Sequence, residues 1–269
     1  MAKFFRKDSE ELERGEMDNI QGLTDYNYYV MSKKEKLLYT LIAAAALYVV
    51  GYIFYHSHIL SAILSLFSLK YPKMRRKQII EKRKNELNLQ FRDMLYSLSS
   101  SLSAGKSVEM AFRDVIKDLM IIYPDPNTSI ILEVELIVRR IEMNETIESA
   151  LADFASRSHL EDVENFADVF QTCKRTGGNI VEIIRNTSNI INDKIEIKQE
   201  ITTLLSSRKF EQKVLNIMPI GLILMLTLTA EDYMNDIFTT IAGRIAMTVA
   251  IIFLVAAYFI SSKITDIKV

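Results

Sequence analysis

Four apolar stretches without a charged side chain form the clearest pattern in this chain. They cover residues 37–55, 59–69, 214–230 and 245–262, and they make two pairs on either side of a long charged segment. A charged side chain at the centre of a bilayer costs roughly 2.5–3.5 kcal/mol on insertion scales, and about 20 apolar residues cross the hydrocarbon. The pattern predicts an all-α integral membrane protein in which two transmembrane helical hairpins flank a cytoplasmic domain.

Lysine and arginine mark one side of these stretches. Lysines 33, 34 and 36 precede the first stretch, a basic run follows the second, and Lys263 and Lys268 follow the last, whereas residues 56–58 and 231–242 contain no lysine or arginine. The positive-inside rule then places both termini and residues 70–213 in the cytoplasm, with the chain multi-pass in the cytoplasmic (inner) membrane. The short stretch 59–69 can cross by borrowing residues 51–55 or by tilting through a thinned bilayer.

The expected divisions follow from this topology. They are a polar N-terminal cytoplasmic tail (1–36), a first transmembrane hairpin (37–72), a cytoplasmic helical bundle (73–212), a second hairpin (213–262) and a short cytoplasmic tail (263–269). The tail lacks the short basic start and apolar core of a cleavable signal peptide, so the first stretch is expected to remain as an anchor.

The charged middle repeats helical spacing throughout, with no alternating strand pattern. Ser107, Thr146 and Asn179 are good N-caps, and each follows a residue suited to the left-handed end of the preceding helix. These turn residues are Gly105, Asn144, Gly177 and Gly178. Three helical hairpins result, pairing 86–104 with 107–122, 129–143 with 146–157, and 160–176 with a long helix from 180. The sequence predicts a six-helix bundle.

The last of these helices carries a heptad of Ile183, Ile190, Ile197 and Leu204, with no proline before Pro219. Two interpretations are open: a coiled coil between subunits, or packing on the domain's own helices. The second is favoured because Thr187 and Lys194 interrupt the companion row. Either way, the helix is expected to run from the domain into the third apolar stretch.

Residues typical of catalysis or of metal and cofactor binding are not found in a convincing arrangement. Gly105-Lys106-Ser107 resembles the end of a phosphate loop, but the glycine required five positions earlier is Ser100. His56 and His58 have no cysteine to complete a metal site, and the acids after His159 suit a helix start. Net charge is −1, which favours no nucleic-acid partner. We expect no enzyme activity and no cofactor.

Charge patterning indicates two surfaces instead. The basic run includes Lys73, Arg75, Arg76 and Lys77, which are suited to lipid headgroups at the inner membrane surface. Acids outnumber bases between residues 133 and 168, and the candidate partner contacts among them are Glu161, Asp162, Glu164 and Asp168. They form either a solvated face or a docking surface for a basic partner.

Residues 145–179 read ETIESALADFASRSHLEDVENFADVFQTCKRTGGN, and residues 102–111 read LSAGKSVEMA. The first segment resembles the cytoplasmic domain of the type II secretion and type IV pilus platform proteins, and the second resembles that domain's first hairpin. One domain between two hairpins is closer to the tight-adherence (Flp) pilus branch than to the duplicated secretion branch.

This resemblance implies a non-enzymatic platform that binds a hexameric secretion ATPase and helps extract pilin subunits from the membrane. It also implies an oligomer, either with itself or with a paralogous platform protein. The competing hypothesis is a membrane sensor or regulatory adaptor whose cytoplasmic bundle recruits a signalling partner. Residues 1–29 carry no motif that the resemblance explains.

Overall fold

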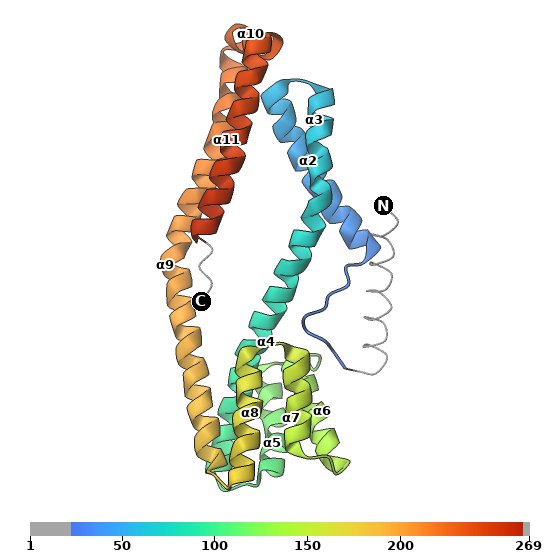
Figure 1. Cartoon of the computed structure of the whole chain (residues 1–269), viewed down its shortest axis with the longest axis vertical. Helices are drawn as coiled ribbons and strands as arrows, with labels where there is room; N and C mark the ends of the chain where they lie inside the picture. The colour runs from blue at the N-terminus through green and yellow to red at the C-terminus, as the bar shows by residue number, and fades with distance from the viewer. Residues whose placement is uncertain (1–22, 266–269) are drawn as a thin grey trace. The chain divides into compact units, whose positions relative to one another are not determined.

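The computed structural model describes residues 23–265, and every regular element in that range is a helix (Figure 1). The elements are α2 (Lys33–Tyr55), α3 (His58–Ser65), η1 (Leu66–Lys70), α4 (Tyr71–Ser103), α5 (Val108–Ile122), α6 (Ser129–Glu142), α7 (Ile147–Ser158), α8 (Glu161–Thr176), α9 (Ile180–Thr229), α10 (Glu231–Thr239) and α11 (Ile241–Thr265). The all-helical fold class is confirmed. Most of the predicted N-terminal tail and the end of the C-terminal tail lie outside the described residues.

The chain divides into two compact units. The first comprises the described part of Met1–Val30 together with Arg76–Glu196, and the second comprises Met31–Arg75 together with the described part of Ile197–Val269. Both α4 and α9 contribute residues to each unit.

The first unit is built around one hydrophobic core. Helices α5, α6, α7 and α8 lie side by side (Figure 1), and consecutive pairs of them are in contact. The apolar stripe of α4 faces this core through Phe91, Met94 and Leu98, all of which are fully buried. Because the side chains of an amphipathic helix are removed from water on one face only, the opposite faces remain polar.

The helix starts in this unit are fixed by side-chain caps. Ser107 Oγ accepts a hydrogen bond from the backbone N–H of Met110 at 3.3 Å, and Thr146 Oγ1 accepts one from Ser149 at 3.3 Å. Asn179 Oδ1 accepts from the N–H of Glu182, also at 3.3 Å. Each cap satisfies a backbone donor that has no partner within its helix.

Left-handed backbone angles end the preceding helices. Gly105 has φ 82°, Asn144 has φ 65° and Gly177 has φ 74°. The expectation that Gly178 also needs a positive φ is wrong, because Gly178 is absent from the described residues with positive φ. A Cβ at Gly178 would lie 2.9 Å from Cys173 Sγ, so close packing rather than backbone angle favours glycine there.

Helix α9 packs on the first unit with a different face from the one favoured by its heptad. Its buried residues in this unit are Ile184, Ser188, Ile191 and Ile195. Ile190, in the heptad row, is 65% exposed. Packing of that row on the domain's own helices is therefore wrong, and the row lies one position away from the intramolecular seam.

In the second unit, α2 and α3 pack against each other across a turn at His56 and Ser57. Gly51 permits this approach, since a Cβ there would lie 3.0 Å from Ser61 Cα. The turn has not moved toward Gly51, which remains inside α2. The segment 231–242, which lacks lysine and arginine, contains the short helix α10.

Three of the described helices are long and apolar enough to cross a membrane: Lys33–Tyr55, Ile180–Thr229 and Ile241–Ile264. Their apolar windows are almost entirely exposed within the protein. A small cluster of Phe54, Met234, Phe238 and Met247 joins α2, α10 and α11. The second apolar stretch is divided between α3 and η1, neither of which alone is long enough to span.

Candidate partner-binding surfaces

The acidic residues of α8 do not share one environment. Glu161, Glu164 and Asp168 are exposed, and the first two lie in the first helical turn. Acids at a helix N-terminus interact favourably with its unpaired N–H groups. Glu161 and Glu164 therefore stabilise α8 while remaining accessible.

Asp162 points inward instead. Its carboxylate accepts a hydrogen bond from Lys194 Nζ of α9 at 2.8 Å and another from Asn88 Nδ2 of α4 at 2.9 Å. The side chain is only 13% exposed. Asp162 therefore ties three helices together, and it offers a partner much less surface than its neighbours do.

A shallow groove beside the exposed acids runs between α7 and α8. Its lining combines small side chains with two acids, Glu164 and Asp168. The residues that line it are Ala152, Ala155, Ser156, Glu164, Ala167, Asp168 and Gln171. A shallow groove lined by small side chains and two acids can accept a basic side chain.

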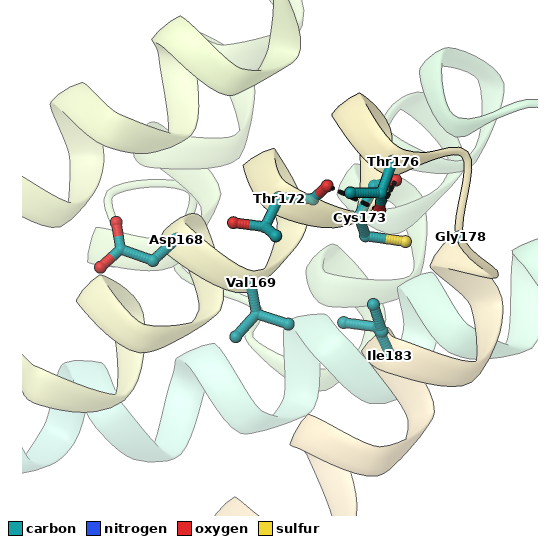
Figure 2. Close-up of a pocket in the computed structure, with 7 residues that line it drawn as sticks. All are labelled: Asp168, Val169, Thr172, Cys173, Thr176, Gly178 and Ile183. Atoms are coloured by element: carbon teal, nitrogen blue, oxygen red, sulfur yellow. Dashed lines mark hydrogen bonds between the residues drawn. The ribbon is translucent and has the colours of Figure 1, made fainter.

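Figure 2 shows a second shallow groove, on the other side of α8, between that helix and the start of α9. Val169 and Ile183 approach it from the two helices, and Cys173 forms its buried end beside Gly178. Asp168 points away from these side chains (Figure 2). Apolar atoms make up most of its lining.

The predicted headgroup contacts lie in the first turns of α4. Lys73 and Lys77 are exposed, whereas Arg75 and Arg76 are half-buried. The Arg75 guanidinium lies 5.6 Å from the Tyr39 ring centre, and that of Arg76 lies 5.6 Å from the Tyr28 ring centre. The lysines are thus the residues of this group best placed to meet headgroups.

No sequence pattern indicated that the N-terminal segment enters the domain, but Tyr26 is buried in the core of the first unit. Its hydroxyl donates a hydrogen bond to Glu133 Oε1 at 2.9 Å, and its N–H donates to the Arg157 carbonyl at 3.0 Å. The Arg157 guanidinium in turn donates to the Thr24 carbonyl at 3.3 Å. Three separate contacts therefore hold this segment to α6 and α7.

Glu133 and Arg157 form a bidentate ion pair beneath Tyr26. The two Nη–Oε distances are 2.7 and 2.6 Å, and the Glu133 side chain is only 4% exposed. Arg157 Nε also donates to Asp153 Oδ2 at 2.9 Å. Burial, followed by the charge and hydrogen bond of Glu133, raises the pKa of Tyr26 far above its ordinary value, so the hydroxyl remains a donor.

One signal for this pair was present in the sequence. Glu133 lies three residues after Ile130 and four before Ile137, on the apolar stripe of its helix. A charge at such a position needs a buried partner, because burying an unpaired charge is very costly. The described residues contain no group of three or more histidines, cysteines and acids that could hold a metal ion.

Comparison with known proteins identifies the family to which much of the helical domain belongs. The family model for type II secretion system (T2SS) protein F matches residues 94–230, half of the chain, from α4 into the apolar part of α9. No curated protein and no solved structure matches the chain. The family consists of membrane platform proteins of secretion and pilus systems rather than enzymes, and three apolar helices among the described residues agree with a membrane location. The chain belongs to the T2SS protein F family.

Proposed function

We propose that this protein is the inner-membrane platform of a tight-adherence (Flp) type pilus or a related secretion apparatus. In this role it couples a hexameric cytoplasmic ATPase to the extraction of pilin subunits, and it works as an oligomer with itself or with a paralogue. The family match over the helical domain and into α9 is the observation that supports the proposal most. Capture of the ATPase by the detergent-solubilised protein tests it, and failure to retain the ATPase at low salt would contradict it.

The proposal includes a topology. Two hairpins, 37–72 and 213–262, flank a six-helix bundle, with both termini cytoplasmic. Cysteines introduced at Ser57 and Asn235 in a Cys173→Ala background should react with an impermeant reagent added to intact cells. Ser156 is exposed and lies on α7, so a cysteine there tests the cytoplasmic side. Reaction at Ser156, but not at the other two positions, would reverse the topology.

We assign the ATPase contact to Glu161, Glu164 and Asp168, together with the neighbouring groove between α7 and α8. Their exposure beside this groove supports the assignment, whereas Asp162 serves mainly to hold α8 against α4 and α9. Replacing the three exposed acids with lysine should weaken ATPase capture several-fold at low salt. The difference should shrink as salt rises, because screening shortens the field to about 8 Å at physiological ionic strength.

A matched control separates local contact from net charge. Asp193, Glu196 and Glu200 are exposed on α9, and replacing them with lysine changes the charge by the same amount. Only the α8 variant should lose affinity. Equal losses in both variants would indicate a general electrostatic attraction and would remove the assignment to this surface.

Lys73 and Lys77, with Arg75 and Arg76 beside them, are proposed to meet anionic lipid headgroups. Each basic residue near an anionic surface contributes about 1 kcal/mol. Replacing Lys73 and Lys77 with glutamine should therefore reduce the protection of the α4 backbone amides from hydrogen exchange in vesicles that contain anionic lipid. It should not change that protection in neutral vesicles. If the variant keeps the wild-type protection in anionic vesicles, or if the wild type is protected equally in both vesicle types, the headgroup contact is excluded.

A further inference from the structure

The segment Thr24–Tyr29 has the form of a bound peptide rather than of a helix of the fold. Its residues lie outside any helix, and an Asx-type turn shapes them: Asp25 Oδ1 accepts from the Asn27 N–H at 2.8 Å. The Tyr28 N–H also donates to the Asp25 carbonyl at 3.3 Å. This turn projects the Tyr26 ring into the core of the first unit.

The domain supplies a matching slot. At its base, Glu133 accepts the Tyr26 hydroxyl, while the Arg157 carbonyl accepts the Tyr26 N–H. Arg157 also donates to the carbonyl of Thr24. The side chain and the backbone of the segment are thus both recognised, and two of these three contacts are independent of the identity of its side chains.

Further contacts surround the slot. His159 Nε2 lies 3.2 Å from Asp25 Oδ1. The Arg76 and Arg83 guanidinium groups lie over the rings of Tyr28 and Tyr29, at 5.6 and 4.4 Å from their centres. A cation over an aromatic face is attracted by the ring, most strongly when it is partly desolvated. These contacts select an acidic residue followed by aromatic residues.

The slot does not depend on the segment for its own geometry. Glu133 and Arg157 belong to α6 and α7 and satisfy each other bidentately, and Asp153 further orients Arg157. If the segment leaves, water can replace its hydrogen bonds to this pair without any change in the helices. Receptor and ligand are therefore separable parts of one chain.

We propose that this slot is a peptide-binding site for short acidic–aromatic segments, and that residues 24–29 are its resident ligand, bound reversibly in cis. Helix α2 begins at Lys33, a few residues after the ligand, so occupancy of the slot restrains the chain that leads into the first candidate membrane span. The proposal stands independently of the pilus function.

Hydrogen exchange on the full-length wild-type protein in detergent tests reversibility. The amides of residues 24–30 should exchange at least tenfold faster than the core amides of α6 and α7, through an opening that leaves those helices protected. Tyr26→Phe should speed exchange of the segment several-fold while α6 and α7 remain unchanged. If the segment exchanges only together with α6 and α7, it is a fixed part of the core and the proposal is wrong.

Binding in trans tests the slot itself. A fluorescent peptide with the sequence of residues 23–31 should bind the full-length Tyr26→Ala protein at least tenfold more tightly than the wild type. In the wild type the resident segment competes at the high effective concentration of a short tether, which is in the millimolar range. A peptide with alanine in place of its tyrosine at position 26 should not bind.

Tyr96→Ala is the matched control, because Tyr96 is 74% exposed on α4. It should behave as wild type in both measurements. Exchange protection of α6 and α7 in the Tyr26→Ala protein verifies that its slot is folded. With those helices protected, equal peptide binding to the wild type and to Tyr26→Ala, or binding to neither, would overturn the proposal.

Discussion

The two units of this protein differ in how much of their apolar surface they bury: the first packs its large apolar side chains into one core, whereas most of those in the second are exposed. In the first, Phe91 is fully buried, and its ring lies 5.6 Å from that of Phe166 and 6.1 Å from that of Phe154. In the second, Phe253 is 72% exposed. The 18-residue windows that make α2 and α11 candidate spans are only 11% and 6% buried within the protein.

This difference identifies the solvent of each unit. Exposing apolar surface to water costs about 25 cal/mol of free energy per Å². A helix as apolar as α11 would therefore be unfavourable in water but not in lipid. The first unit removes its apolar side chains from water by packing them together. The second leaves them on the outside because the bilayer provides their apolar surroundings.

The largest expected effect comes from deleting an aromatic ring in each setting. Phe91→Ala should destabilise the first unit by about 3–5 kcal/mol, because it removes buried contacts and leaves a cavity. Phe253→Ala should cost far less, because most of that side chain is exposed to the surroundings of the helix. Pulse proteolysis of the detergent-solubilised protein measures both, and equal losses would break the comparison between the units.

The next effect concerns a buried ion pair and an exposed one. Glu133→Gln should cost about 3 kcal/mol, because it leaves Arg157 partly uncompensated in a buried site. The Arg208–Glu211 pair of α9 is highly exposed, so Glu211→Gln should cost about 0–1 kcal/mol. Denaturant titrations of both variants measure the difference. A cost for Glu133→Gln as small as that for Glu211→Gln would show that water already reaches the slot.

Glycine provides the third contrast. Gly177 has φ 74°, and its replacement with alanine should cost about 1–2 kcal/mol because an L side chain is strained there. Gly221 lies inside α9, and a Cβ there meets nothing within 4 Å. Gly221→Ala should stabilise the helix by about 0.5–1 kcal/mol. Thermal melting of both variants distinguishes the two roles.

Gly178 tests the close contact found in the structure. Gly178→Ala should destabilise the turn by crowding Cys173 Sγ, and Cys173→Ala in the same protein should recover part of the loss. Additive losses in the double variant would show that the two residues do not interact.

Local pattern predicted much of the first unit. The caps at Ser107, Thr146 and Asn179, and the turn residues Gly105 and Asn144, each act on backbone groups a few positions away. Such short-range chemistry can be recognised from a sequence. Helix starts were therefore predicted within a residue or two for α5 to α9.

Contacts between distant segments were not predictable in this way. Tyr26 and Glu133 are 107 positions apart, and nothing periodic in the tail indicated their hydrogen bond. The heptad of α9 failed for a related reason: its spacing defines a row, but the row of Ile184 and Ile191 has the same period one position away. Which row faces the domain depends on the position of α8 and α4, which spacing alone does not specify.

The smallest expected effect lies in the contact that joins α8 to α9. Lys194→Met removes the cation from Asp162, whose carboxylate then retains only Asn88, and should cost about 0.5–1 kcal/mol, since Lys194 is 45% exposed. Arg208→Met, in the second unit, removes a cation from an exposed pair within one helix and should cost about 0.5 kcal/mol or less. Denaturant titrations at low and high salt should show both losses shrinking with salt, and the Arg208→Met loss shrinking more completely because its pair is more exposed. If the loss of stability in Lys194→Met disappears entirely at high salt, Asp162 is hydrated. Its carboxylate would then belong, with Glu161, Glu164 and Asp168, to the accessible acidic surface.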